Sequence, residues 1–219
     1  MNILFILLTF LISVFIARML IPRILLISMR KKLFDMPDAR KIHKKAIPRL
    51  GGVSFFPTVL FTYCLVYTFR LLLGCELTSL YTSYLLPEML LFACGMTLLY
   101  LTGIADDLVG VRYRQKFVIQ IFCACLFPLS GLWINNLYGL FGIYELAPYI
   151  GMPFTVFTVV FITNAINLID GIDGLASGLS SVALLIFTFL FIEKGLWSYA
   201  MLAAGTFGVL VPFFYYNVF

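Results

Sequence analysis

Charged side chains are scarce in this sequence. Only 11% of its 219 residues are Asp, Glu, Lys or Arg, and 63% are hydrophobic, whereas a soluble domain carries about a quarter charged residues. The mean hydropathy is +1.06. This composition excludes an ordinary soluble globular domain. It predicts an integral membrane protein, and we expect no nucleic-acid partner.

Cysteine patterns that would hold a metal are also lacking. The five cysteines lie mostly inside apolar runs, and the closest pair, Cys123 and Cys125, is only two residues apart. That spacing excludes the usual cysteine metal sites, so we expect the cysteines to be core residues. Internal repeats, low-complexity tracts and linkers are absent too. We therefore treat residues 1–219 as one helical domain.

Long apolar runs recur along the chain, at Ile3–Leu20, Val53–Leu73, Met89–Ile104, Phe117–Trp133, Ile150–Ile162, Leu179–Ile192 and Leu196–Tyr216. A membrane span needs about 20 residues. The sequence thus predicts an all-α, polytopic helical bundle with about seven transmembrane helices, the fourth to sixth being short. No Lys or Arg precedes the first run and no cleavage site follows it, which favours a first span over a signal peptide, with the N-terminus outside.

Basic residues gather in two loops. Nine of the fifteen Lys and Arg lie between Arg23 and Arg49, and three more follow at Arg112, Arg114 and Lys116. The positive-inside rule makes both loops cytoplasmic. With seven alternating spans, all six aspartates fall on the cytoplasmic face and all four glutamates on the opposite face.

The first polar segment, "DMPDARKIHKKAIPRLGG", runs from Asp35 to Gly52. Its charges and prolines argue against a continuous helix. Two interpretations stay open. The segment is either a topology signal attracted to anionic lipid or an anion site in which His43 and Arg49 precede Gly51 and Gly52, where a backbone without Cβ atoms lets a phosphate approach closely.

The second polar segment, "GIADDLVGVRYRQK", places Asp106 and Asp107 at the cytoplasmic end of the third run. Carboxylates at that depth must be hydrated, ion-paired or bound to a cation. Two interpretations stay open here as well: carboxylates that serve chemistry, or a structural latch in which Arg112 and Arg114 pair with the aspartates.

The third polar segment is "NAINLIDGIDGLASG", between the fifth and sixth runs. Its polar residues recur every third position and drift along one face while the backbone stays helical; they are Asn164, Asn167, Asp170 and Asp173. Such oxygen ligands suit a hard cation such as Mg²⁺, which is commonly shared with substrate phosphates. An EF-hand is excluded by the spacing. A polar helix break of a transporter is the alternative.

Two acidic segments and one basic segment on one membrane face form a combination that neither a topology signal nor a latch predicts. Carboxylates suit a metal, and cations with glycine backbone suit phosphate. The combination suggests phosphoryl transfer at the membrane surface between a soluble partner and a lipid. A transporter would instead place acidic residues near the bilayer midplane.

The three segments, in this order and at these separations, resemble the polyprenyl-phosphate N-acetylhexosamine-1-phosphate transferases (glycosyltransferase family 4). The residues that carry the resemblance are "PDARKIHKKAIPRLGG", "GIADD" and "NAINLIDGIDGLASG", between Pro37 and Gly178. The form of the first motif looks like the branch that transfers GlcNAc 1-phosphate to undecaprenyl phosphate, at the start of cell-envelope polysaccharide synthesis.

The resemblance implies that the phosphate of undecaprenyl phosphate attacks the β-phosphorus of a UDP-N-acetylhexosamine, giving lipid-diphosphate-sugar and UMP in the bacterial inner membrane. It implies Asp106 or Asp107 for deprotonating or orienting the lipid phosphate, and Asn167 for holding Mg²⁺ (or Mn²⁺). The other implied substrate-binding residues are Asn164, Asp170 and Asp173 near the nucleotide, and His43, Arg49, Gly51 and Gly52 near the phosphates. The oligomeric state stays open.

The same resemblance implies about ten or eleven spans, with a metal-binding aspartate and a histidine-rich loop after the seventh. The sequence stops at "PFFYYNVF", before either, so we expect the N-terminal part of the family fold, and an inactive fragment is one alternative. A CDP-alcohol phosphatidyltransferase is disfavoured, because "DGLASG" has Ser177 where that family's motif has arginine.

Overall fold

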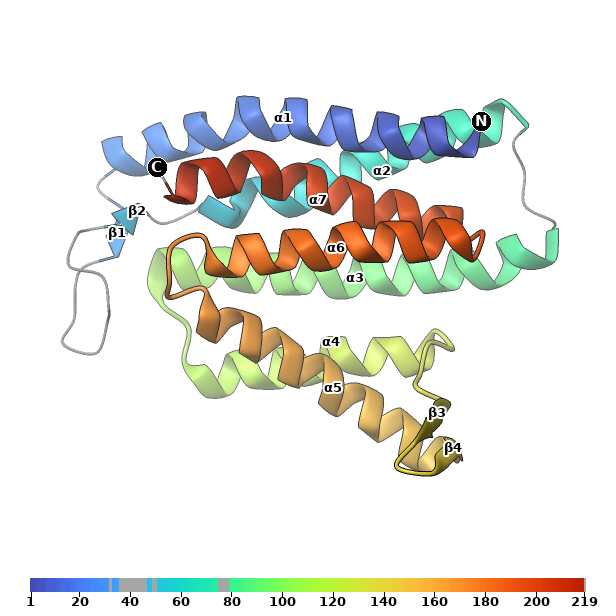
Figure 1. Cartoon of the computed structure of the whole chain (residues 1–219). Helices are drawn as coiled ribbons and strands as arrows, with labels where there is room; N and C mark the ends of the chain where they lie inside the picture. The colour runs from blue at the N-terminus through green and yellow to red at the C-terminus, as the bar shows by residue number, and fades with distance from the viewer. Residues whose placement is uncertain (32, 36–46, 49–50, 75–78, 219) are drawn as a thin grey trace. The chain divides into compact units, whose positions relative to one another are not determined.

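The computed structural model describes residues 1–31, 33–35, 47–48, 51–74 and 79–218 (Figure 1). Seven α-helices account for most of these residues. Their bounds are α1 Asn2–Arg30, α2 Phe55–Leu72, α3 Ser79–Val109, α4 Tyr113–Leu129, α5 Pro148–Ile169, α6 Leu175–Glu193 and α7 Trp197–Val218. The predicted all-α polytopic class is confirmed, since six of these helices are long and apolar enough to cross a membrane.

The helix that falls short of that criterion is α4, with 17 residues. The prediction that the fifth and sixth spans are short was wrong, because α5 has 22 residues and α6 has 19. The predicted spans were too short because the apolar runs were ended at polar residues that the helices in fact include. Helix α5 continues past Ile162 through Asn164 and Asn167, whose side chains do not interrupt the backbone ladder. Likewise, α1 continues through Pro22 to Arg30.

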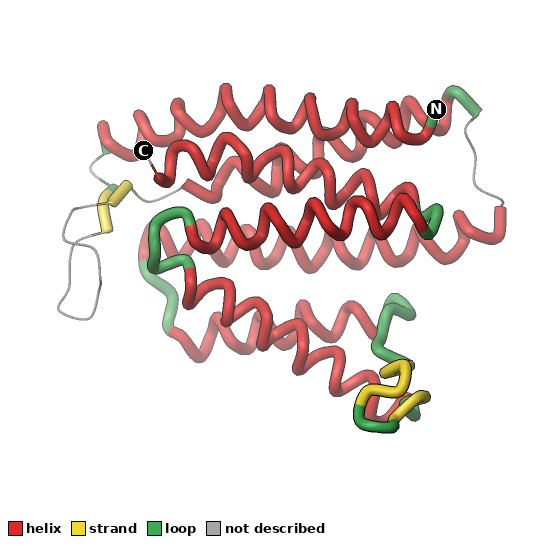
Figure 2. Tube along the Cα trace, in the orientation of Figure 1, coloured by secondary structure: helices red, strands yellow, loops and turns green. Residues whose placement is uncertain are grey.

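Short elements complete the chain (Figure 2). A 3₁₀ turn, η1 at Gly51–Ser54, leads into α2. Strands β1 (Phe34–Asp35) and β2 (Ile47–Pro48) pair antiparallel, as do β3 (Asn136–Leu140) and β4 (Ile143–Glu145). The apolar runs did not predict the hairpin of β3 and β4.

The helices form two compact units, Met1–Glu76 with Asn167–Phe219, and Leu77–Ile166. In the first unit, α7 packs against α1, α2 and α6. Its core joins Phe5 and Ile6 of α1, Val66 of α2 and Met201 of α7. Because small residues line this face of α7, the neighbouring backbones approach closely, as is common between membrane helices.

Gly208 of α7 lies directly against α1. A Cβ added there would lie 2.7 Å from the carbonyl oxygen of Phe10 and 2.9 Å from Cβ of Ser13. Backbone atoms cannot yield as a side-chain tip can, so we expect Gly208→Ala to lower the free energy of unfolding by about 1–3 kcal/mol. The control is Gly103→Ala in α3, where an added Cβ meets nothing within 4 Å. Thermal unfolding in detergent compares the two, and equal midpoints would contradict the packing described.

In the second unit, α3 packs against α4, and α5 closes onto the segment that follows α4. The hydroxyl of Thr155 accepts a hydrogen bond of 2.8 Å from the Ile134 N–H. A Cβ on Gly151 would lie 2.5 Å from both the Trp133 ring and the Ile134 carbonyl oxygen. Glycine at this position is therefore what allows α5 to begin so close to Trp133.

The cysteines only partly follow the prediction. Cys123 is buried, and its thiol lies 3.5 Å from the Gly95 carbonyl oxygen that accepts its hydrogen bond. Cys125 is half-buried, Cys64 in α2 and Cys94 in α3 are exposed, and Cys75 lies outside the described residues. The expectation of core cysteines was wrong for Cys64 and Cys94, because a helix in a membrane protein can turn apolar side chains outward toward lipid.

Candidate active site

The first polar segment lies mostly outside the described residues, and so do His43 and Arg49. Gly51 and Gly52 are described, and they begin the 3₁₀ turn that leads into α2. A Cβ on Gly51 would lie 3.3 Å from the ring of Phe213, near the end of α7, while one on Gly52 would meet nothing within 4 Å. The backbone at Gly52 is thus open on the side where a Cβ would stand.

Asp106 and Asp107 lie in the last turn of α3, as the sequence predicted. The Asp106 carboxylate accepts a hydrogen bond of 2.9 Å from the Val111 N–H and forms an ion pair with Lys116 at the start of α4. About a third of the Asp106 side chain is exposed (34%). Asp106 therefore fixes the turn between α3 and α4 and still faces solvent.

The ion pair described in this turn differs from the predicted latch. The latch assigned Arg112 and Arg114 to the aspartates, but Asp106 pairs with Lys116. Arg114 instead donates to the Tyr113 hydroxyl at 3.0 Å and lies over the Tyr113 ring. Helix α4 begins at Tyr113, and Lys116 one turn later is the cation that reaches back to α3. For Asp106, a latch of the predicted kind is present, and its cation is Lys116.

Asn164 and Asn167 lie on the last turns of α5. The Asn164 amide donates hydrogen bonds of 2.8 Å to the Val160 carbonyl oxygen and to the side-chain oxygen of Gln120 on α4. Asn167, one turn further, is exposed. In this helix Asn164 is held by α4, and Asn167 presents its amide outward.

Asp170 and Asp173 lie in the turn that joins α5 to α6, not on a helix face. The helix ends at Ile169, so the predicted three-residue periodicity stops before these aspartates. Both side chains are exposed. The turn is closed by hydrogen bonds from the Ile172 N–H to the Ile169 carbonyl oxygen (3.2 Å) and from the Leu175 N–H to the Ile172 carbonyl oxygen (3.0 Å).

Two of the polar segments meet the same end of α7. The Phe213 ring lies 3.3 Å from where a Cβ of Gly51 would stand, and Val218 and Phe214 lie 2.5 Å and 3.2 Å from where a Cβ of Gly174 would stand. The start of α2 and the turn that carries Asp170 and Asp173 therefore share one end of the first unit (Figure 1). This arrangement agrees with the prediction that the first and third segments lie on one membrane face.

Two polar residues of the second unit were missed by sequence reasoning. Lys116 and Gln120 are four residues apart on α4, hence on one helix face, and they hold Asp106 of α3 and Asn164 of α5. In the sequence, Lys116 served only as one of the basic residues that indicate a cytoplasmic loop. The available signal was Gln120, a lone amide in the otherwise apolar run of α4.

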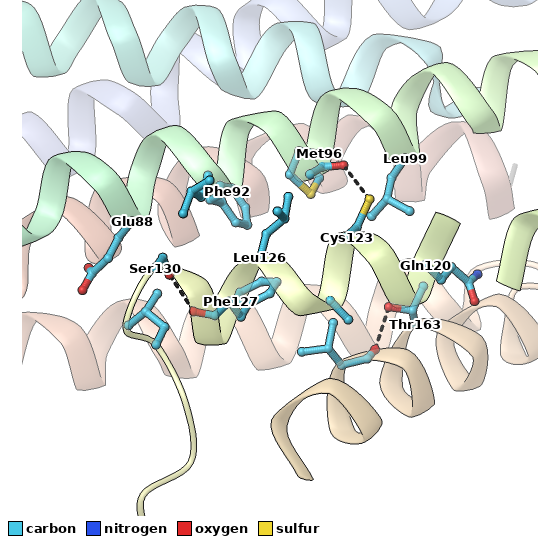
Figure 3. A pocket seen from close by; sticks show the side chains of 15 residues that line it. Glu88, Phe92, Met96, Leu99, Gln120, Cys123, Leu126, Phe127, Ser130 and Thr163 are labelled. Atoms are coloured by element: carbon cyan, nitrogen blue, oxygen red, sulfur yellow. Dashed lines mark hydrogen bonds between the residues drawn. The ribbon is translucent and has the colours of Figure 1, made fainter. Parts of the chain in front are cut away.

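A pocket in the second unit lies between α3, α4 and α5 (Figure 3). Its lining is mostly apolar, with Phe92, Met96 and Leu126 among its walls, and with Gln120 and Thr163 among its few polar members. None of the predicted site residues lines it. We therefore place the candidate chemistry at the ends of the helices and not in this pocket.

The donor set of the third segment fits a hard cation. Within the described residues, no group of three or more His, Cys, Asp or Glu side chains is arranged to hold a metal alone. Asn167, Asp170 and Asp173 offer exposed oxygens close together in sequence. Mg²⁺ is usually bound by one or two carboxylates together with waters and substrate phosphates, so a full protein cage is not required.

Comparison with known families identifies the family to which this chain belongs. A family model described as glycosyl transferase family 4 matches residues 89–219. This range contains Asp106, Asp107 and the whole segment from Asn164 to Gly178. The chain belongs to glycosyl transferase family 4. The predicted family is therefore confirmed.

Individual curated proteins extend the likeness to most of the chain. This chain is 29% identical over 177 residues to a Bacillus subtilis protein named probable undecaprenyl-phosphate N-acetylglucosaminyl 1-phosphate transferase. The match covers 80% of this chain and 45% of that protein. It is also similar to two proteins named undecaprenyl-phosphate alpha-N-acetylglucosaminyl 1-phosphate transferase. The one from Yersinia pestis is 28% identical over 194 residues, which cover 85% of this chain and 47% of that protein. The one from Escherichia coli K12 is 30% identical over 181 residues, which cover 78% of this chain and 44% of that protein. The chain spans about half the length of the curated relatives it matches.

Proposed function

We propose that this chain carries residues for transfer of an N-acetylhexosamine 1-phosphate, GlcNAc 1-phosphate in the first instance, from a UDP-sugar to undecaprenyl phosphate. The observation that carries the proposal is the family match over residues 89–219, which includes the second and third polar segments. The names of the relatives from Bacillus subtilis and Escherichia coli support the lipid acceptor and the sugar.

In the proposed reaction, an oxygen of the lipid phosphate forms a bond to the β-phosphorus of the UDP-sugar. The bond from that phosphorus to the oxygen bridging the two phosphates breaks, and UMP leaves with the electron pair. A phosphate monoester has its second pKa near 6, so the nucleophile is largely ionised at neutral pH and needs little general-base help. The protein's main contribution is then positioning and electrostatic stabilisation.

The proposed roles follow the charges. Asp106 or Asp107 orients the lipid phosphate or accepts its remaining proton, and Lys116, paired with Asp106, adds a cation at this end of α3. Asp170 and Asp173 shape the nucleotide site from their exposed turn, and His43 and Arg49 contact phosphates. Gly51 and Gly52 let phosphate approach the backbone at the start of α2.

Asn167 would hold Mg²⁺, or Mn²⁺ in its place, with the substrate phosphates supplying further oxygens. When bound, the ion neutralises charge on the diphosphate as it develops. Asn164 acts differently, because its amide is already engaged by Gln120 of α4. We assign Asn164 to positioning the end of α5 near the nucleotide.

We also propose that the site faces the cytoplasm of a bacterial plasma membrane. Nine of the fifteen basic residues lie between Arg23 and Arg49, directly before the η1 turn at Gly51. The positive-inside rule then places this end of α2 in the cytoplasm, where UDP-sugars are available.

Metal removal tests the proposal. Membranes containing the 219-residue chain are mixed with undecaprenyl phosphate, Mg²⁺ and radiolabelled UDP-GlcNAc, and label is counted in the organic extract. We expect lipid-phase label that EDTA abolishes and that added Mg²⁺ restores, since an uncompensated diphosphate resists attack by an anionic nucleophile. The Escherichia coli relative is the positive control. Label that persists in EDTA would contradict the metal assignment, and no label from either UDP-GlcNAc or UDP-GalNAc would contradict the proposed transfer.

A further inference from the structure

The hairpin of β3 and β4 has an unusual tip. Its two-residue loop is Phe141-Gly142, with φ of +55° and +75°. Two positive φ values in succession characterise the turn that normally takes Asn-Gly, because Asn and Gly tolerate the left-handed region. Here a phenylalanine occupies the first position, where a bulky side chain is a conformational outlier.

A second aromatic residue repeats the pattern. Tyr138 in β3 has φ of +51°, and the Asn136 side-chain oxygen accepts a hydrogen bond of 2.6 Å from its N–H. Left-handed backbone at a non-glycine residue is energetically unfavourable and persists where something else requires it. Packing against the part of the chain that the structure describes does not supply that requirement, since Tyr138 is 88% exposed and Phe141 is 91% exposed.

The rest of the hairpin is well ordered around this tip. The Tyr144 ring lies 3.3 Å from where a Cβ of Gly139 would stand, so Gly139 leaves room for it. The Leu146 N–H donates to the Asn135 carbonyl oxygen at 2.8 Å and closes the base. The hairpin is thus a defined element that presents aromatic side chains outward, rather than a loop that happens to contain them.

The hairpin lies directly before a candidate membrane span in the sequence. Strand β4 ends at Glu145, and the candidate span α5 begins at Pro148. The hairpin therefore ends only a few residues before the start of this candidate span. The first turn of α5 also exposes apolar side chains, at Tyr149 and Ile150.

The charge pattern agrees with a lipid neighbour. Between Lys116 and Lys194 the sequence has no basic residue, and Glu145 is the one charged residue of the hairpin. Aromatic side chains with polar tips and few charges are typical of the belt where a membrane protein crosses the headgroup region. A tip of a few side chains is also far smaller than a stable protein interface requires.

We propose that the β3–β4 hairpin is a membrane-interface anchor, with Tyr138, Phe141 and Tyr144 embedded among the glycerophospholipids of the leaflet at the N-terminal end of α5. The burial of exposed aromatic surface in the interface offsets the left-handed backbone at Tyr138 and Phe141. The anchor fixes the start of α5 at the membrane surface. This inference does not depend on the proposed transferase function.

Photochemical cross-linking to lipid tests the anchor. The full chain carrying Phe141→p-benzoylphenylalanine is reconstituted in vesicles of phosphatidylethanolamine and phosphatidylglycerol that contain a radiolabelled phospholipid, and label on the protein is measured after irradiation. Phe122, exposed on the flank of α4, provides the lipid-facing standard, and Gln115, exposed between Arg114 and Lys116, the aqueous standard.

We expect the lipid adduct at position 141 to approach that at position 122 and to exceed that at position 115 several-fold. The same probe at Tyr138 should behave alike, which guards against one variant that folds poorly. A yield at both positions no higher than at Gln115 would overturn the anchor. So would a product of twice the chain mass as the main adduct, because that result would make the tip a contact between two copies.

Discussion

Replacement of Asp106, Asp107 or Asp173 by asparagine is expected to lower the rate of sugar-phosphate transfer by about 100-fold or more in each case. Asparagine keeps the size of the side chain and an oxygen that can accept a hydrogen bond, but it removes the charge. At Asp106 the Val111 N–H keeps an acceptor, and the lost ion pair with Lys116 is part-exposed and worth about 1 kcal/mol or less. At Asp106 the loss should therefore appear in turnover and not in folding.

The matched control is Glu193→Gln, which removes an exposed carboxylate at the opposite end of α6 from the Asp173 turn. Its rate should stay near that of the unaltered chain. Initial rates of organic-phase labelling, normalised to folded protein, provide the comparison. Near-normal rates in all three aspartate variants would remove the site assignment.

Gly174→Ala is expected to cause the largest loss of stability. Gly174 has φ of +74° at the start of α6, and a Cβ there would lie 2.5 Å from Val218 Cγ2 and 3.2 Å from the Phe214 ring. Left-handed backbone costs an alanine about 1–2 kcal/mol, and overpacking adds about 1–3 kcal/mol. Because the same turn carries Asp170 and Asp173, transfer should fall with stability.

Gly195→Ala separates the two contributions. Gly195 has a similar φ of +70°, but an added Cβ would meet nothing within 4 Å. It should therefore show the backbone cost alone, and Val218→Ala should recover part of the loss in Gly174→Ala. Unfolding midpoints in detergent measure both effects. A Gly195 variant as unstable as the Gly174 variant would show that contact with the end of α7 is unimportant.

The apolar runs predicted the helices well because a membrane span is set by length and hydrophobicity, both of which are local properties. Helix limits were less accurate. The fifth apolar run ended at Ile162, yet α5 continues to Ile169, because the side chains of Asn164 and Asn167 leave the backbone hydrogen bonds of the helix intact. The β3–β4 hairpin was missed because Phe141-Gly142 lacks the usual Asn-Gly signal.

The chemistry-bearing residues were visible in the sequence because acids, amides and glycines stand out among apolar neighbours. Their partners were not. The pairing of Asp106 with Lys116 instead of Arg112 depends on the rotation of α4 about its axis, which apolar composition does not define. Gly51 and Gly174 both lie against the end of α7, and only the packed helices reveal that these residues, distant in sequence, share this neighbour.

The most direct test of the proposed transfer follows sugar and phosphorus together. A UDP-GlcNAc donor carrying one label in the sugar and another at the β-phosphorus is supplied with undecaprenyl phosphate, Mg²⁺ and membranes containing the chain. We expect both labels in the lipid phase in the donor's own ratio, with UMP as the released nucleotide. Sugar label without phosphorus label, together with release of UDP, would contradict transfer of a sugar 1-phosphate.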